Sequence, residues 1–365
     1  MKILFLGDYS NVHACIGHQL KQQGHDVTIV SDRGGFQLTH ADRVLQRRPG
    51  LLGGARFLYD AFSLLPELSG YDAVQLINPH FWQLRPGKLR YFLRRIREKN
   101  GPVYLTLAGN DTHFVRACRE GRLFRFSEYR VGTERTQKVI EDPAWEYGWL
   151  HDKVAAYCDE VYSLIAGAMA VLPEYDMAAR EVLGDRCRFT NIPIDLACHP
   201  FTPLPDTEEV RIAVGMKPGR ETQKGTDRLL DAARRLEASS GGSVTVERVS
   251  GLSYRDYLRR LQDFHIVLDQ LYAYSPATNA LDAMALGRVA GSGGEQEYYD
   301  YIGETERRPV IALSPLDPDL TETLRLAVAD RDALARRARE GREIVERCND
   351  AALVAARFLD VWRQG

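Results

Sequence analysis

Short apolar runs alternate with longer amphipathic stretches along most of the chain. In the first part the apolar runs are rich in branched side chains and have the length of buried strands: residues 2–6, 26–30, 71–77 and 102–107. The stretches over 12–23 and 87–99 instead carry apolar side chains at helical spacing. Strands that alternate with helices predict an α/β fold with parallel sheets, because parallel neighbours need a crossover connection.

The alternation starts again after a proline-rich segment, which we predict to be a linker between two domains. His199–Pro205 holds three prolines, and a new strand pattern begins at Val210. A helix pattern over 226–238 follows that strand. We therefore predict an N-terminal domain over residues 1–200 and a C-terminal domain over residues 206–348, both of the α/β class.

One strand-loop-helix stretch in the second half is the strongest candidate for a ligand site. An apolar run over 265–269 precedes a polar loop and a helix of small residues. Parallel strands place the start of such a helix at their carboxyl edge, where its free N–H groups attract a phosphate. Ser275, Thr278 and Asn279 lie at this start. Asp282 follows one turn later and can reach a ribose hydroxyl, although simple capping by Thr278 or Asn279 and a solvated Asp282 are the alternatives.

A second candidate is the loop that follows the strand over 210–215. It carries three cations, Lys217, Arg220 and Lys224, and a helix begins after the last of them. A departing diphosphate develops negative charge, which fixed cations and helix N–H groups stabilise most strongly. A cationic surface loop is common as an isolated pattern, but next to the segment around Asp282 it predicts a diphosphate site.

The sequence D-A-M-A-L-G-R-V over 282–289 is similar to a known donor-binding segment. It resembles that of GT-B-fold glycosyltransferases, especially the large retaining nucleotide-sugar-dependent family of the group 1 type. That family has two acids eight positions apart before A-M-A-x-G-x-P-V. Asp282 takes the place of the second acid, Tyr274 stands where the first would fall, and Arg288 stands where proline is usual. The resemblance implies two Rossmann-like domains that face each other across a cleft, with residues 349–365 packing back on the first.

The resemblance also suggests roles for the donor-site residues. Lys224 corresponds to a lysine that binds the donor's phosphates in this family. The loop is longer here, so Arg220 corresponds to the family's arginine, with Lys217 as the other candidate. The ring of Tyr274 can stack on the base or the sugar.

The strand end over 109–113 resembles the H-G-x-D strand end of the same family, with Ala108 where histidine is usual. Asp111 takes the place of the acid. Either Asp111 or His113 can orient or deprotonate an acceptor hydroxyl. A lone histidine in a loop is more often structural, and that alternative stays open for His113.

The first strand-helix turn holds Ser10, Asn11 and His13. The family often has glycines at this turn, which admit the donor's phosphates. This chain lacks them, so we expect the turn to serve the acceptor instead of a phosphate.

Composition excludes several classes of protein. The 365 residues are 44% hydrophobic, and the six cysteines include no C-x-x-C pair, which argues against a zinc site and a disulfide framework. The G-x-G-x-x-G fingerprint of dinucleotide-binding proteins is absent. The D-x-D over 317–319 resembles a metal-binding motif, but Asp319 precedes a helix pattern and is expected to cap it.

Charge is uneven along the chain, with fourteen Lys and Arg against eight Asp and Glu in residues 1–100. The helix pattern within 85–99 is basic and amphipathic, so it can rest on an anionic membrane or be a solvated crossover helix. We expect a cytoplasmic protein, either free or held at the inner face of the membrane. No nucleic-acid partner is expected, because the net charge is −2 and the basic helix lacks an aromatic platform.

The sequence thus predicts a glycosyltransferase that moves a sugar from a nucleotide-diphosphate sugar to a saccharide or lipid-linked acceptor. By the family resemblance its pathway would be surface polysaccharide or glycolipid biosynthesis, and it would need neither a metal nor another cofactor. A nucleotide-sugar epimerase is the enzymatic alternative. A non-catalytic glycosyltransferase-like protein is the other, because the first acid is missing.

Overall fold

The structure is a computed structural model that describes residues 1–32 and 41–364. The chain divides into two compact units. Unit 1 contains residues 1–116, 147–193 and 351–365, and unit 2 contains residues 117–146 and 194–350. Each unit is built around its own parallel sheet.

Unit 1 contains a sheet whose printed strand pairs are all parallel. Its order is β3 (Arg43–Val44), β2 (Asp26–Ser31), β1 (Lys2–Leu6), β4 (Ala73–Leu76), β5 (Val103–Leu107), β8 (Gly167–Ala170) and β9 (Cys187–Phe189). The strand order reverses between β1 and β4. In open α/β sheets such a reversal opens a crevice at the carboxyl ends of the strands, where ligands bind.

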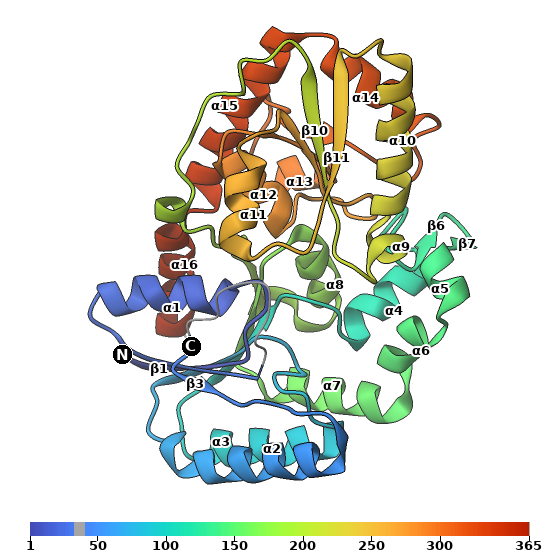
Figure 1. The fold of residues 1–365 in the computed structure, drawn as a ribbon. Coiled ribbons are helices and arrows are strands. Elements are labelled where there is room, and N and C mark those ends of the chain that lie inside the picture. The colour runs from blue at the N-terminus through green and yellow to red at the C-terminus, as the bar shows by residue number, and fades with distance from the viewer. Residues whose placement is uncertain (33–40, 365) are drawn as a thin grey trace. The chain divides into compact units, whose positions relative to one another are not determined.

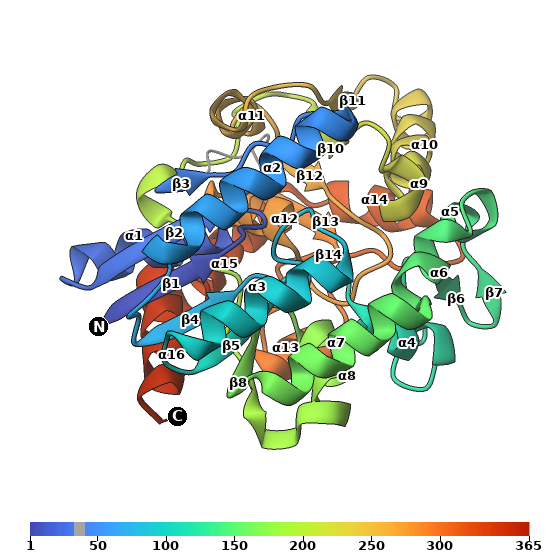
Figure 2. The same ribbon diagram turned by 90° about the horizontal axis from the view of Figure 1, so that it is seen from below.

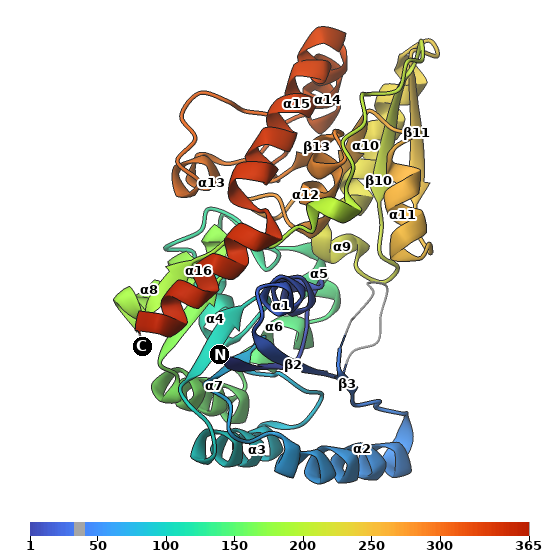
Figure 3. The ribbon, with the colours of Figure 1, turned by 90° about the vertical axis from the view of Figure 1, so that its left-hand side faces the viewer.

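Helices cover both faces of the first sheet (Figure 1). They are α1 (Val12–Gln22), α8 (Pro173–Leu183) and α16 (Ala351–Gln364) on one face, and α2 (Gly50–Leu64), α3 (Pro86–Glu98) and α7 (Asp152–Leu164) on the other. Figure 2 shows α2, α3 and α7 running side by side. α16 packs on α1, so the end of the chain completes unit 1 (Figure 3).

Unit 2 contains a shorter parallel sheet, whose strand order reverses between β10 and β12. The order is β11 (Val244–Val249), β10 (Val210–Gly215), β12 (Ile266–Leu268), β13 (Val289–Ser292) and β14 (Ile311–Ala312). The helices are α9 (Glu221–Lys224), α10 (Thr226–Ser239), α11 (Tyr254–Leu261), α12 (Thr278–Ala285), α13 (Gln296–Tyr301), α14 (Leu320–Val328) and α15 (Arg331–Cys348).

Alternate side chains of β10 enter two separate apolar clusters. Val210, Ile212 and Val214 pack with α10 and α14, whereas Ala213 packs with α11 and α12. This alternation follows from the two-residue period of a strand. The sheet is therefore buried on both faces, and the ends of its strands are where a ligand can bind.

Residues 117–146 pack with unit 2, although the predicted first domain ran through residue 200. The segment runs from the end of α4 (Thr112–Glu120) to the start of α6 (Ala144–Leu150) and contains β6 (Arg130–Val131), β7 (Glu134–Arg135) and α5 (Gln137–Glu141). β6 and β7 form a small antiparallel ribbon. The chain returns to unit 2 after Pro193, through short 3-10 turns such as Leu196–Cys198.

Most predicted elements are observed within two or three residues of their expected ends. The helix predicted over 226–238 is α10, and the strand predicted at 2–6 is β1. Residues 160–163 belong to α7, where Val161 and Tyr162 face the core. Asp319 caps α14, as expected, by accepting hydrogen bonds from the N–H groups of Thr321 and Glu322.

None of the helices in residues 1–32 and 41–364 combines the length and the apolar content needed to cross a lipid bilayer.

Candidate functional site

The reversal point of the second sheet gathers the residues of the candidate donor site. β10 ends at Gly215, and the neighbouring β12 is followed at once by Asp269. α9 and α10 begin after the first of these strands, and α12 begins after the second. This is the edge at which an open α/β sheet binds its ligands.

A polar network links the two strand ends. Lys224 Nζ lies 2.9 Å from Asp269 Oδ1, and Asn279 Nδ2 donates to the same oxygen at 3.1 Å. Asn279 Oδ1 in turn accepts a hydrogen bond of 2.7 Å from the hydroxyl of Tyr257. Lys224 and Asn279, both predicted donor-site residues, are therefore brought together by Asp269.

Asp269 is fully buried, and its second oxygen, Oδ2, has no hydrogen-bond partner among the described residues. Its ion pair with the partly exposed Lys224 holds the lysine amine at the end of β12. An ammonium group has three donors, so this pairing leaves Lys224 able to donate to an incoming anion.

Gly215 is needed because side chains cross directly over it. A Cβ atom at this position would lie 2.4 Å from the hydroxyl of Tyr257 and 2.9 Å from Asn279 Nδ2. Both distances are below the van der Waals limit. The glycine at the end of β10 therefore lets the polar network close over the strand.

Asp282 lies on α12 and is buried, with a polar side chain close to each carboxylate oxygen. Oδ1 lies 3.0 Å from His199 Nε2, and Oδ2 accepts a hydrogen bond of 3.1 Å from the hydroxyl of Tyr254. Burial raises the pKa of Asp282, against the opposing effect of His199. A solvated Asp282 is therefore excluded in this structure.

The remaining predicted donor residues are arranged less tightly. Arg220 is exposed, and its Nε donates to Gln223 Oε1 at 2.9 Å instead of entering the network. Lys217 is also exposed on the same loop. Thr278 is partly exposed at the first turn of α12, and Ala277, at the N-cap position, has no side chain that can accept a hydrogen bond. The first N–H groups of α12 are therefore not capped by that residue.

Tyr274 does not present its ring to a ligand. It is 2% exposed, and its ring stacks on Phe126 with centroids 4.6 Å apart. Phe124 packs against the same ring, and the backbone N–H of Arg125 donates to the tyrosine hydroxyl. The segment over 117–146, called the inserted segment below, thus packs on the ring of Tyr274, where a sugar or base was predicted to stack.

Arg125 also joins two acids that follow the glycine-rich turn after β13. Its guanidinium binds Glu297 Oε1 at 2.6 Å and Glu295 Oε2 at 2.7 Å, and it lies 5.0 Å from the ring of Tyr274. Glu295 and Glu297 thus place two carboxylates near Tyr274, the position at which the resembled family has its first acid.

Ser275 is fully buried, so its side chain is not exposed to a ligand in this structure. The backbone beside it rests on Gly293, where a Cβ atom would lie 2.2 Å from the carbonyl oxygen of Ala273. The loop over 273–275 is therefore shaped by close backbone packing.

The predicted catalytic residues of unit 1 are both buried. Asp111 accepts hydrogen bonds from the hydroxyl of Tyr162 at 2.7 Å and from the N–H of Phe114 at 2.9 Å, so it caps α4. His113 Nε2 lies 3.1 Å from Asp159 Oδ1. Burial lowers the pKa of His113, against the opposing effect of Asp111 and Asp159. The hollow beside Asp111 is too narrow for a water molecule.

The turn after β1 is exposed in part. Ser10 is exposed and Asn11 is half-buried, and both have left-handed backbone conformations. His13 is fully buried instead: its Nδ1 lies 2.7 Å from the carbonyl oxygen of Gly7, and its Nε2 lies 2.9 Å from Thr106 Oγ1. Burial lowers its pKa to about 3. His13 therefore points into unit 1, and a contact of this turn with the acceptor stays a prediction.

Asp8, in the same turn, is buried at the reversal point of the first sheet. Burial raises its pKa to about 7, although the backbone N–H of His13 donates to Oδ1. Asp8 therefore places a buried carboxyl group at the end of β1.

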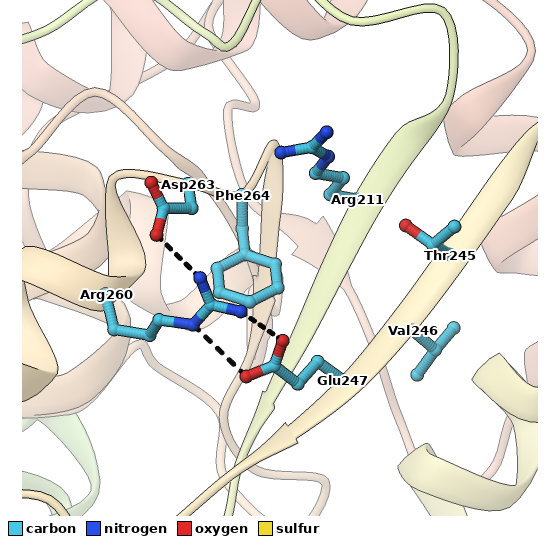
Figure 4. A pocket seen from close by; sticks show the side chains of 7 residues that line it. All are labelled: Arg211, Thr245, Val246, Glu247, Arg260, Asp263 and Phe264. Atoms are coloured by element: carbon cyan, nitrogen blue, oxygen red, sulfur yellow. Dashed lines mark hydrogen bonds and ion pairs between the residues drawn. The ribbon is translucent and has the colours of Figure 1, made fainter.

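A hollow of about 180 Å³ lies in unit 2, but at the opposite edge of the sheet (Figure 4). Arg211 and Thr245 stand at the starts of β10 and β11, and Arg260 is bound there by Glu247 and Asp263. Because Lys224 and Asp282 lie at the strand ends, this hollow is not part of the candidate donor site.

His, Cys, Asp and Glu side chains do not gather, within the residues that the structure describes, into groups of three that can hold a metal ion.

No family model matches this chain, and no curated protein sequence matches it. Solved structures match it over its whole length. Sucrose-phosphate synthase from Thermosynechococcus elongatus is 14% identical with a TM-score of 0.63, and the match covers 100% of this chain and 99% of that chain. HepE from Anabaena in complex with UDP and glucose is 11% identical with a TM-score of 0.65, and both chains are covered completely.

A third solved structure is WaaG, a glycosyltransferase involved in lipopolysaccharide biosynthesis, which is 13% identical with a TM-score of 0.58 and complete coverage of both chains. These likenesses show that the chain has the fold of the GT-B glycosyltransferases. The fold predicted from the segment around Asp282 is confirmed.

Three residues of the site were not predicted. Asp269 ends the apolar run over 265–269, and an acid directly after a buried apolar run is the signal that could have identified it. His199 lies in the proline-rich linker, where no motif marks it. Arg125 lies 149 positions from Tyr274, and no local pattern connects the two.

Proposed function

We propose that this protein is a glycosyltransferase that takes a sugar from a nucleotide-diphosphate sugar. The observation that carries the proposal is the network of Lys224, Asp269 and Asn279 at the reversal point of the second sheet. It combines a cation held in place with the start of a helix, which is what a diphosphate requires. The HepE structures contain UDP or UDP-glucose, and a starch synthase IV structure from Arabidopsis thaliana contains ADP.

In the proposed reaction the bond between the sugar's anomeric carbon and the diphosphate oxygen breaks, and a bond from that carbon to the acceptor oxygen forms. Lys224 and the first N–H groups of α12 stabilise the charge on the departing diphosphate. Asp269 holds the amine in position, so little reorganisation is needed when the charge develops. We propose that no metal is required for this step. Because the donor segment resembles that of retaining enzymes, we also propose retention of the anomeric configuration.

Arg220 and Lys217 are the further candidates for phosphate contacts, and the fully buried Ser275 is a candidate only through its backbone. Thr278 can donate its hydroxyl at the start of α12. Asp282 is proposed to bind the ribose. Tyr274 is proposed to support the sugar subsite from behind, since its ring is covered by Phe126.

The acceptor hydroxyl loses a proton as it attacks, and His113 is the better of the two predicted bases. Burial lowers its pKa, so its ring is neutral at physiological pH and can accept a proton. Asp111 is occupied by Tyr162 and by the N-terminus of α4, and we assign it the role of orienting that segment. Ser10 and Asn11 are proposed to contact the acceptor.

We infer that the acceptor is a saccharide or is lipid-linked, and that the reaction belongs to surface polysaccharide or glycolipid biosynthesis. Exposed cations on and after α3, namely Lys88, Arg97 and Lys99, suit contact with an anionic membrane. Other cations of α3 are bound within unit 1, because Arg90 and Arg94 both pair with Glu160. The proposed location is the cytoplasm, at the inner face of the membrane.

Nucleotide binding tests the proposal. Wild-type protein is heated with UDP, ADP, GDP and their glucose derivatives, and a specific ligand raises the melting temperature. Lys224→Met is expected to lose most of that rise. Lys138→Met is the matched control, because Lys138 is also a partly buried lysine of unit 2, ion-paired with Asp142 at 3.0 Å.

Two results would contradict the proposal. One is the absence of any rise in wild type with the whole panel, and the other is an equal rise in Lys224→Met and wild type. Incubation of the stabilising nucleotide sugar without acceptor adds a second readout, since slow release of free sugar indicates a transferase. Conversion to another nucleotide sugar would indicate an epimerase.

A further inference from the structure

His199 and Asp282 form a buried pair whose distances favour one arrangement of the protons. His199 is 2% exposed, and its Nδ1 lies 2.7 Å from the carbonyl oxygen of Asp195. A carbonyl oxygen can only accept, so Nδ1 carries a hydrogen. Nε2 lies 3.0 Å from Asp282 Oδ1 and 3.5 Å from the hydroxyl oxygen of Tyr254. Lone pairs of Nε2 and Oδ1 would repel each other at 3.0 Å, so a proton between these two atoms is the favoured arrangement.

The pair therefore holds one proton more than a neutral histidine beside an ionised aspartate. When the carboxylate is ionised, the ring is an imidazolium. Although burial opposes a charged ring, Asp282 raises the pKa of His199, which favours this state. The alternative state, a neutral ring beside a protonated acid, holds the same proton on Asp282.

Further contacts fix both members of the pair. Arg342 Nη1, from α15, donates at 2.6 Å to the carbonyl oxygens of His199 and Ala285, which joins the linker to the end of α12. Tyr254, from α11, donates to Asp282 Oδ2 at 3.1 Å. Each carboxylate oxygen has two acceptor sites, so each can accept one more hydrogen bond.

We propose that His199 is a positioning residue for nucleotide recognition: it holds the Asp282 carboxylate in the one orientation that accepts hydrogen bonds from the ribose hydroxyls. This inference rests on the proposed function and adds to it a residue from the linker. Thr278 lies one turn before Asp282 on the same helix face and is partly exposed, so the ribose approaches from that side.

The pair responds to pH together with its neighbours. Asp269 and Tyr257 interact electrostatically with Asp282. The side chain of Asp195 accepts from the N–H of Ala197, and its charge also raises the pKa of His199. Since Asp282 raises the pKa of His199 against the opposing effect of burial, the shared proton is kept to a higher pH than on a free histidine and is lost as the pH rises through that raised value. Loss of the proton leaves a lone pair of Nε2 facing a carboxylate, which weakens the orientation of Asp282.

The test compares a ribonucleotide with its 2′-deoxy form, because only the ribonucleotide has the hydroxyl in question. Affinities are measured by calorimetry for UDP, 2′-deoxy-UDP, ADP and 2′-deoxy-ADP. For the base that binds, we expect wild type to prefer the ribonucleotide by roughly 10-fold to 100-fold, the range for a hydrogen bond to a charged group. We expect His199→Leu to lower the affinity for the ribonucleotide to about that for the deoxynucleotide, and to leave the affinity for the deoxynucleotide unchanged.

Two further variants separate positioning from a structural role. His199→Gln keeps a donor near Nε2 and is expected to retain most of the preference, but without the decline that wild type shows at mildly alkaline pH. Tyr254→Phe removes the second donor and is expected to reduce the preference in part. Nitrogen NMR of the wild-type protein without nucleotide is expected to show both ring nitrogens of His199 protonated at neutral pH.

The outcomes are distinct. Equal losses of UDP and 2′-deoxy-UDP affinity in His199→Leu, or an unchanged preference, would overturn the positioning role while the proposed function stands. A His199 ring with an unprotonated Nε2 at neutral pH, with Asp282 ionised, would also overturn it. If no nucleotide binds the wild-type protein, the proposed function fails and this inference fails with it.

Discussion

The backbone N–H of Arg125 donates a hydrogen bond of 2.5 Å to the hydroxyl of Tyr274, across 149 positions of sequence. Phe124 and Phe126, on either side of Arg125, pack on the same ring. Tyr274 replaces an acid of the resembled family, and the inserted segment is what makes this replacement stable. A hydroxyl at the far end of a buried ring needs a partner, and a fixed backbone donor supplies it.

We expect Tyr274→Phe to lower the free energy of unfolding by about 1 kcal/mol, because it removes one buried hydrogen bond. Tyr274→Ala is expected to lower it by roughly 3–5 kcal/mol, because the stacked ring is lost as well. Urea denaturation measures both. Tyr272→Phe, at a half-buried position two residues earlier, is the control and should stay within about 0.5 kcal/mol of wild type. Equal effects of the Tyr274→Phe and Tyr272→Phe changes would show that the Arg125 contact does not stabilise unit 2.

Gly215 allows a second prediction, because a methyl group there would enter the polar network of the candidate donor site. The Gly215→Ala side chain would displace the Tyr257 hydroxyl and Asn279, at an expected cost of about 1–3 kcal/mol in unfolding free energy. Nucleotide affinity should fall with it, since Asn279 helps to hold Asp269.

Gly87→Ala is the control for this change. Gly87 lies in the first turn of α3, and no neighbouring atom lies within 4 Å of the added Cβ. It should leave stability equal or slightly raised, because alanine is the better helix former. A Gly215→Ala protein with wild-type stability and nucleotide affinity would mean that the network is loose and does not define the site.

The elements that carry the candidate donor site could be predicted from sequence because its motifs are local, while the roles of its residues stay a prediction. Lys224 and Asp282 each stand at a fixed place after a strand, and strand, loop and helix are consecutive in the chain. The partner of each residue could not be predicted. Asp269 reaches Lys224 across 45 positions, and His199 lies far before Asp282, so only the folded sheet brings them together.

The directions of the side chains in the proposed acceptor region could not be predicted, because they depend on which groups are buried. His13 and Asp111 stand at strand ends, as the pattern indicated, but both side chains turn inward and bind groups of their own unit. A strand end shows where a side chain starts and not which way it points. The inserted segment over 117–146 was missed for a related reason: its partner lies in the other half of the sequence.

Arg288 shows how a departure from the family pattern is accommodated. This arginine, at a position where proline is usual, is 1% exposed, and its guanidinium donates to the carbonyl oxygens of Gln262 and Phe264 at 3.1 Å and of Pro203 at 2.6 Å. It thereby ties the linker to the end of α11 and the start of β12.

We expect Arg288→Leu to lower the unfolding free energy by roughly 3 kcal/mol or more, because several buried carbonyl groups lose their donor. Arg288→Lys should cost less, since one ammonium replaces part of the donors but cannot span them all. Urea denaturation again gives the values. Full stability of the Arg288→Leu protein would show that water replaces the guanidinium and that the linker is held by other contacts.

The last prediction concerns α2, whose first turn exposes two adjacent leucines. Leu51 is 95% exposed and Leu52 is 89% exposed, close in sequence to Arg47 and Arg48. Apolar side chains beside cations suit insertion into an anionic bilayer surface, where each buried leucine adds about 1.5–3 kcal/mol at most.

We therefore expect the double variant Leu51→Ser with Leu52→Ser to sediment with phosphatidylglycerol-containing vesicles about 10-fold more weakly than wild type. Leu353→Ser, at another exposed leucine of unit 1, is the control and should bind like wild type. Raised salt should weaken binding of all three proteins, because the cations of α3 are screened. Equal sedimentation of the double variant and wild type would exclude α2 from the proposed membrane contact. Equal binding to pure phosphatidylcholine vesicles would show that the cations do not contribute to it.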